Sequence, residues 1–194
     1  MKRNKILAVF MLATVMTTNL LGASTVYAAP TTGDSDADVE LKEGGGTIGP
    51  LTIENVTNFD FGVNELSSKE ETYTAKVDGD TSISDLRGTG VGWSLLASIT
   101  DFTAQDTTGH TLIGAELTLP AGTPVSDGSS SAPVSSETVL NNQSQNVLDA
   151  VKDSGLGVWK VDYTGTTLKV PSGSYAGQYT STITWTLQDA PVTP

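Results

Sequence analysis

The sequence predicts an all-β fold, an antiparallel β-sandwich of Ig-like or jelly-roll-like type, and three observations support this. Apolar and polar residues alternate with period two over several short segments. Turn-forming runs of Gly, Asp and Pro separate these segments, and no long amphipathic helical pattern lies between them. One segment leaves a short helix open. Over 139–152, Val147, Leu148 and Val151 fit a helical stripe, and an irregular strand with a loop fits them equally well.

The first 28 residues have the pattern of a secretory signal peptide. Three basic residues precede an apolar stretch over 6–21, and small residues follow it. We place cleavage after Ala28, with Ala29 as the alternative. An uncleaved membrane anchor is the competing interpretation, but the apolar stretch is short and interrupted by polar residues. We therefore expect a secreted protein without a membrane span in its mature chain.

The composition excludes several kinds of site. The chain has 194 residues, no cysteine and one histidine, His110, which rules out disulfides, thiolate metal sites and multi-histidine metal sites. We expect neither a metal nor a cofactor. The formal net charge is −12, and loss of the three basic residues in 1–28 makes it −15. So acidic a chain does not suit nucleic-acid binding, which depends on Lys and Arg neutralising phosphates.

After the signal peptide we expect a flexible acidic leader over 29–49 and one folded domain over 50–194. The leader is rich in Gly, Asp and Glu and has too few large apolar residues to pack. Within the domain, alternation predicts strands in 51–55, 72–77, 91–100, 112–119, 158–163 and 179–187. Residues 127–136, rich in Gly, Ser and Pro, predict a loop between two groups of strands.

The two clearest strands contain the same tripeptide pattern. Trp93-Ser94-Leu95 lies in the first, and Trp185-Thr186-Leu187 lies in the second, where threonine fills every even position from 180 to 186. Residues i and i+2 of a strand share a face, so each Trp-x-Leu unit presents two apolar side chains in one direction.

With these two motifs the chain resembles the WxL-domain surface cell wall-binding proteins of Gram-positive bacteria. The second motif lies near the C-terminus in the phrase TITWTLQDAP, as in that family. Further blocks that resemble the family's lie at 51–62, 84–102, 112–119 and 155–191, in the family's order. The resemblance covers nearly all of the chain from Gly49 to Pro191.

The resemblance implies a non-catalytic protein of the cell wall and cell surface that binds peptidoglycan non-covalently. The motif residues that would bind are Trp93, Leu95, Trp185 and Leu187. It also implies other WxL proteins, a membrane-anchored WxL-interacting protein and host matrix proteins as partners. The alternative function is therefore a protein-binding adhesin or a subunit of a cell-surface complex.

Physical reasoning leaves two roles open for the motif tryptophans. A buried Trp supplies much of a small core's apolar area, so both residues suit a core that pins two strands together. In the other role, the indoles line a shallow groove and stack on sugar rings. Arg87, a secondary ligand candidate, is likewise suited to clamping a wall carboxylate or phosphate or to pairing with Asp85. The many carboxylates show no spacing that singles out a catalytic pair, so we expect no enzyme activity.

Overall fold

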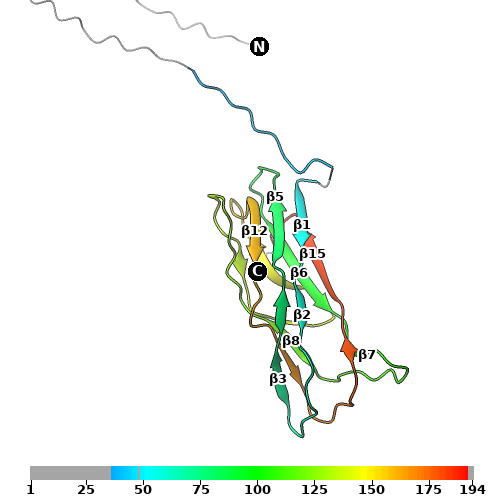
Figure 1. The fold of residues 1–194 in the computed structure, drawn as a ribbon. Helices are drawn as coiled ribbons and strands as arrows, with labels where there is room; N and C mark the ends of the chain where they lie inside the picture. Colours follow the sequence, from blue (N-terminus) through cyan, green and yellow to red (C-terminus); the bar gives the residue numbers. More distant parts are fainter. Residues whose placement is uncertain (1–35, 48, 192–194) are drawn as a thin grey trace, which may run out of the picture. The chain divides into compact units, whose positions relative to one another are not determined.

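The computed structural model describes residues 36–47 and 49–191, and over these residues the chain is built from β-strands without a helix (Figure 1). The chain divides into two units, Met1–Val39 and Glu40–Pro194, and the strands of the described residues all lie in the second. The predicted signal peptide and its cleavage site at Ala28 lie outside the described residues. The all-β fold with antiparallel pairing is confirmed, whereas the Ig-like or jelly-roll-like sandwich type and the domain bounds stay predictions.

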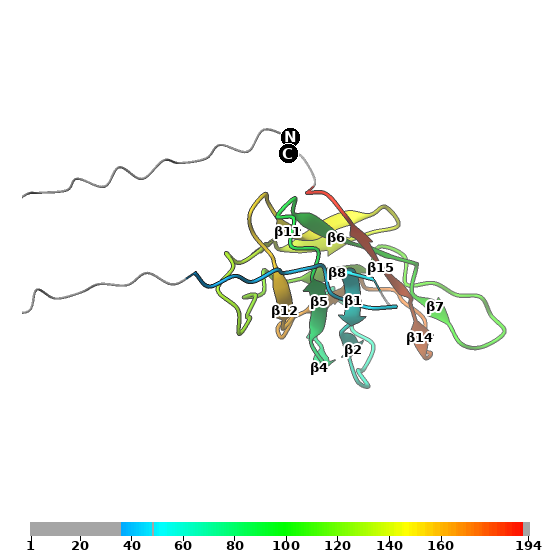
Figure 2. The same ribbon diagram turned by 90° about the horizontal axis from the view of Figure 1, so that it is seen from above.

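Three larger sheets make up most of the second unit (Figures 1 and 2). The first has the order β1-β5-β12, from Leu51–Asn55, Thr81–Asp85 and Gly157–Val161. The second has the order β10-β8-β13-β3, from Thr138–Leu140, Glu116–Leu119, Thr167–Val170 and Glu71–Thr74. The third has the order β15-β6-β11-β9, from Ile183–Gln188, Trp93–Ile99, Gln145–Ala150 and Val134–Ser135.

Two smaller pairs of strands complete the fold over the described residues. β14, Tyr179–Thr180, pairs with β7, Thr103–Ala104, and β2, Asn58–Asp60, pairs with β4, Lys76–Asp78. One apolar core joins the three larger sheets, because each of them contributes buried side chains to it. Its members include Ile83, Trp93, Leu95, Leu117, Leu119, Val147, Trp159 and Leu168.

The short helix considered for 139–152 does not form, so that alternative is wrong. This segment forms β10 and β11 with a turn between them. The register of β11 against β6 shifts between Asn146 and Leu148, so a bulge places consecutive Val147 and Leu148 in buried positions. That bulge breaks the period-two pattern, and the resulting apolar pair imitates a helical stripe.

Two other predicted strands are shorter than the alternation suggested. The strand expected over 72–77 divides at Ala75, whose N–H donates to the Thr166 carbonyl at 2.8 Å. The strand expected over 112–119 begins only at Glu116, because Leu112 to Ala115 closes a turn with Gly114 at φ 78°. At Ala75 the chain therefore changes its pairing partner from β13 to β2, whereas at 112–115 a turn replaces strand pairing although the side-chain pattern continues.

Candidate functional site

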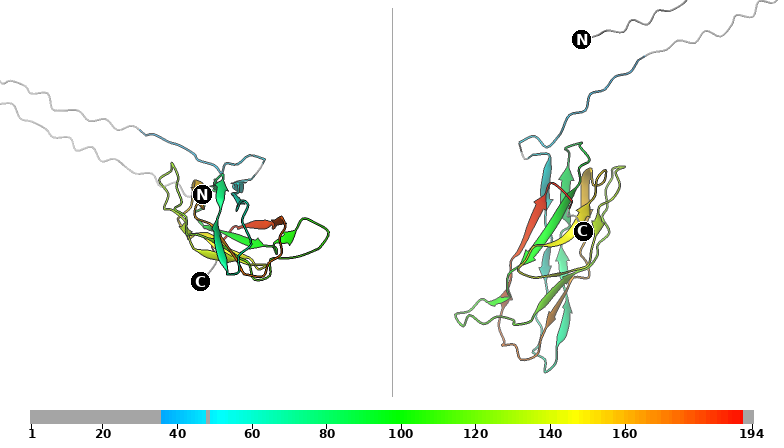
Figure 3. Two further views of the ribbon diagram at one scale, coloured as in Figure 1. Left: turned by 60° about the horizontal axis from the view of Figure 1, so that its bottom comes forward. Right: turned by 180° about the vertical axis from the view of Figure 1, so that it is seen from behind.

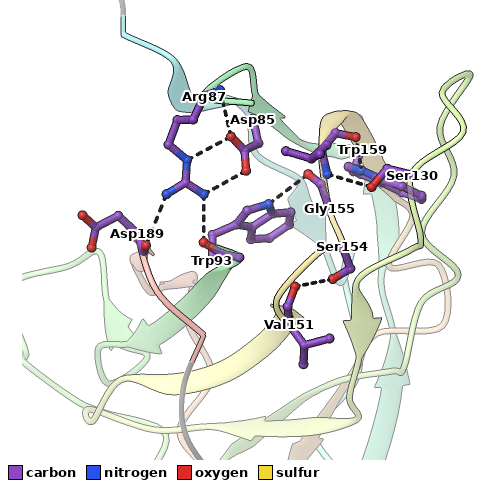
Figure 4. Close-up of polar contacts among 11 residues, drawn as sticks. Asp85, Arg87, Trp93, Ser130, Val151, Ser154, Gly155, Trp159 and Asp189 are labelled. Carbon is purple, nitrogen blue, oxygen red and sulfur yellow. Dashed lines mark hydrogen bonds and ion pairs between the residues drawn. The ribbon is translucent and has the colours of Figure 1, made fainter. Parts of the chain in front are cut away.

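The first motif lies in the interior of the fold. β6 has a partner strand on each side, β15 and β11, and Trp93 and Leu95 are both 0% exposed. The Trp93 indole Nε1–H donates to the Gly155 carbonyl at 3.0 Å (Figure 4). Gly155 has φ 73°, and a Cβ on it would lie 2.7 Å from that Nε1 atom. This indole is therefore closely fitted and has no exposed surface.

The second motif lies at the edge of the same sheet. In β15 the odd residues are half-buried and the even residues are exposed, so Trp185 and Leu187 lie on the inward face. Leu187 is directly opposite Leu95, and Trp185 is opposite Ala97. The two motifs are therefore cross-strand neighbours, which is the arrangement expected if they pin two strands together.

Trp185 connects the core to a groove on the surface. Its ring lies 5.9 Å from that of Tyr163, with 29° between the ring planes. Tyr163 is fully buried, and this burial raises the pKa of its phenol above the ordinary value, so the ring stays neutral. Trp185 itself is half-buried and lines a groove of about 1290 Å³.

This groove, which we call the aromatic groove, collects most of the aromatic residues of the described chain. Its wall is formed by β2 and the loop after it, by the 171–182 segment with β14, and by the first half of β15. Seven aromatic side chains line it: Phe59, Phe61, Tyr73, Phe102, Tyr175, Tyr179 and Trp185. All seven are partly or largely exposed, whereas Trp93, Trp159 and Tyr163 are buried.

The rim of the groove holds one of these rings in place. Tyr175 is 61% exposed, and His110 stacks on it with ring centroids 3.9 Å apart. The Tyr179 hydroxyl donates to the Tyr175 carbonyl at 3.1 Å, so the 175–179 segment is fixed from two sides. Polar groups lie between the rings, among them Asn58, Asn64, Ser174, Gln178, Thr180 and Thr182.

The sequence prediction missed six of the seven rings. The signal that would have found them is their clustering in turns and short strands, as in Phe59-Asp60-Phe61 and Tyr175 to Tyr179. Neither segment has enough alternation to predict a strand, and their meeting depends on the tertiary fold.

Arg87 lies outside the aromatic groove. Its Nε and Nη2 donate to the two carboxylate oxygens of Asp85 at 2.9 and 2.8 Å, so the pair is bidentate (Figure 4). Nη2 also donates to the Gly92 carbonyl at 2.8 Å, and Nη1 donates to the Asp189 carbonyl at 3.2 Å. The hydrogen bonds to Asp85 raise the pKa of the guanidinium further. Four of its five N–H groups are thus engaged within the chain.

The described residues contain no group of three His, Cys, Asp or Glu side chains able to hold a metal ion. In that same part of the chain, none of the elements is a helix with the length and apolar character needed to cross a membrane.

The described residues thus form a β-framework with an aromatic groove at its surface. A family model described as WxL domain, surface cell wall-binding, matches residues 25–191, and the chain belongs to this family. The protein is accordingly a surface cell wall-binding protein located at the cell wall or cell surface. The comparisons with curated proteins and with solved structures give no match.

Proposed function

We propose that this protein attaches non-covalently to the cell wall by binding the glycan strands of peptidoglycan in the aromatic groove, without catalysis. The observation that supports this is that the aromatic residues of the described chain separate into seven partly exposed rings in one groove and three buried rings elsewhere. Of the motif residues, Trp185 contacts the glycan, and Trp93, Leu95 and Leu187 hold its strand in position.

The chemistry of the groove suits an uncharged sugar chain. Sugar rings have apolar C–H faces that stack on aromatic rings, and their hydroxyl and N-acetyl groups match the Asn, Gln, Ser and Thr side chains between the rings. The groove also has three acidic residues, Asp60, Glu65 and Glu71, against one basic residue, Lys69. This excess of negative charge disfavours a phosphate-rich wall polymer and leaves the glycan as the ligand.

The carboxylates of the groove do not have the environment of a catalytic pair. A glycosidase needs one carboxylic acid whose burial keeps it protonated, beside a second carboxylate. Asp60, Glu65 and Glu71 are all exposed. Asp60 accepts from the Gly62 N–H at 2.8 Å and Glu71 from the Ser67 hydroxyl at 2.9 Å, so both stabilise local turns.

Removal of one groove ring should weaken wall binding without unfolding the domain. Tyr175→Ala removes a ring that is 61% exposed, and a lost stacking contact of about 1.4 kcal/mol lowers affinity about tenfold. Trp185→Phe should likewise keep the fold and lower affinity, because the smaller ring covers less of a sugar face. Pull-down with purified peptidoglycan, with and without its secondary polymers, measures both.

Val151→Ala is the matched control, because Val151 is 54% exposed and does not line the groove. Circular dichroism checks the fold of each variant. Undiminished pull-down of folded Tyr175→Ala and Trp185→Phe would contradict the groove as the glycan site. Binding only to immobilised matrix proteins would favour the adhesin alternative, and release of soluble sugar from the wall would contradict a non-catalytic role.

A further inference from the structure

The second motif strand has one hydrogen-bonded side only. Thr100 N–H donates to the Thr182 carbonyl at 3.0 Å, and β15 continues from there in regular antiparallel register with β6. In an antiparallel ladder, hydrogen-bonded residue pairs alternate with pairs that are not hydrogen-bonded. The backbone groups of Thr184, Thr186 and Gln188 are therefore the ones that bond to β6. The backbone N–H and C=O groups of Ile183, Trp185 and Leu187 therefore point away from the sheet. We call this row of backbone groups the β15 edge.

The β15 edge has none of the features by which proteins protect exposed strands. From Tyr179 to Gln188 the sequence has no charged residue and no proline, and the register of β15 shows no bulge.

The other five edges of the three larger sheets are each protected. β1 follows Pro50 and has a bulge between Ile53 and Asn55. β3 starts at Glu71, directly after Glu70. β9 and β10 have only two and three residues. β12 is covered by the bridge between Lys160 and Val125. Among the described strands, β15 alone therefore combines length, regularity and absence of charge at an edge.

A hollow of about 990 Å³ lies beside this edge. Leu187, Gln188 and Asp189 line it on one side, and Leu51 to Ile53 of β1 line it on the other. β1 and β15 run next to each other there without a hydrogen-bonded ladder between them (Figures 1 and 3). Leu86 N–H bonds to the Pro50 carbonyl, so by the same alternation the backbone groups of Leu51 and Ile53 also point away from β5.

We propose that the β15 edge is a docking site for an extended polypeptide segment of a partner protein, which adds to the sheet as a fifth strand beside β15. Its donors and acceptors recur every second residue, at about 6.8 Å, a repeat that another β-strand matches. The half-buried Ile183, Trp185 and Leu187 require apolar side chains at alternate positions of the partner.

Charge defines the partner further. Glu54 and Asp189 are exposed near the hollow, while the only cation lining it, Arg87, is held by Asp85. The docking segment therefore has lysine or arginine at its ends. Trp185 belongs to both surfaces, because its backbone groups lie on the β15 edge and its ring lines the aromatic groove.

Amide hydrogen exchange of residues 29–194, the chain without its predicted signal peptide, tests the proposal. Without a ligand, the amides of Trp185 and Leu187 should exchange at least tenfold faster than those of Thr184 and Thr186. The probe is a nine-residue peptide of alternating Thr and Val with a lysine at each end. At millimolar concentration it should slow exchange at Trp185 and Leu187 at least tenfold, and a version with glutamate ends should do so less. Slow exchange of these two amides in the free protein, or no protection by the lysine peptide, would overturn the proposal.

Two substitutions of opposite charge at one exposed position, Thr186, provide the matched variants. Thr186 is exposed, and its side chain lines neither the aromatic groove nor the hollow. Thr186→Lys should lower the affinity for the lysine peptide about two- to fivefold, and Thr186→Glu should raise it. Like charges on neighbouring strands repel and opposite charges attract. Neither change should alter peptidoglycan pull-down, whereas Trp185→Phe should reduce pull-down and leave the peptide bound. Equal peptide affinity of the two Thr186 variants would contradict the charge assignment.

Discussion

Trp93→Ala should remove most of the stability of the domain. The side chain is 0% exposed, and truncation of a buried Trp costs about 3–5 kcal/mol. The Gly155 carbonyl also loses its donor, which adds about 1–3 kcal/mol. Small domains have total stabilities of about 5–15 kcal/mol, so the variant should be largely unfolded or close to it. Urea denaturation followed by circular dichroism measures the change.

Two variants give this experiment its controls. Trp159→Ala should be similarly destabilising, because Trp159 is buried and donates to the Leu156 carbonyl at 3.0 Å, although it belongs to no motif. Trp185→Ala should cost only about 1–2 kcal/mol, because that ring is only partly buried. A Trp93→Ala protein with normal stability and no wall binding would contradict a core role and restore Trp93 as a ligand contact.

Arg87→Met should destabilise the domain by about 3 kcal/mol. The Asp85 side chain is 0% exposed and the Arg87 side chain 12% exposed, so the substitution leaves a buried carboxylate without its cation. The wild-type pair is bidentate, and Arg87→Lys should recover only part of the loss because an ammonium cannot reproduce the fork. Urea midpoints of the three proteins give the comparison.

The control is replacement of the cation by methionine in an ion pair that is exposed. Lys169 pairs with Glu116 on the surface, and Lys169→Met should leave the urea midpoint unchanged within error. The double variant Asp85→Asn, Arg87→Met should be more stable than Arg87→Met alone, because a neutral amide is less costly to bury. If folded Arg87→Met instead has normal stability and reduced pull-down by peptidoglycan, Arg87 is a ligand clamp and the structural role is wrong.

The two motifs have equivalent sequences but different structural roles. β6 lies inside its sheet and β15 at its edge, so Trp93 has neighbours on all sides while Trp185 is partly accessible. The interior position also changes the second face of β6. Ser94 and Leu96, which lie on that face, are buried as well, and Ser94 donates to Asp149 of β11.

β5 shows why part of the fold escaped sequence reasoning. Its residues, Thr81 to Asp85, are all buried, yet four of the five are polar and no alternation marks them. Two of these polar side chains have partners outside the strand: the Thr81 hydroxyl lies 2.9 Å from that of Thr57, and Asp85 accepts from Arg87. A buried polar strand is stable only with such partners. The periodicity of a short segment contains no information about a partner 24 residues away.

The sequence by itself determined the all-β class, most of the long strands and the pairing of apolar positions in each Trp-x-Leu unit. These features depend on local periodicity, in which side chains two residues apart share a face whatever lies around the strand. Only the tertiary structure decided which motif is buried, that Arg87 is tied to Asp85, and that seven rings from distant segments meet in one groove. Burial and contact depend on which strands become neighbours, and here that is set by pairings across most of the chain, such as β15 with β6.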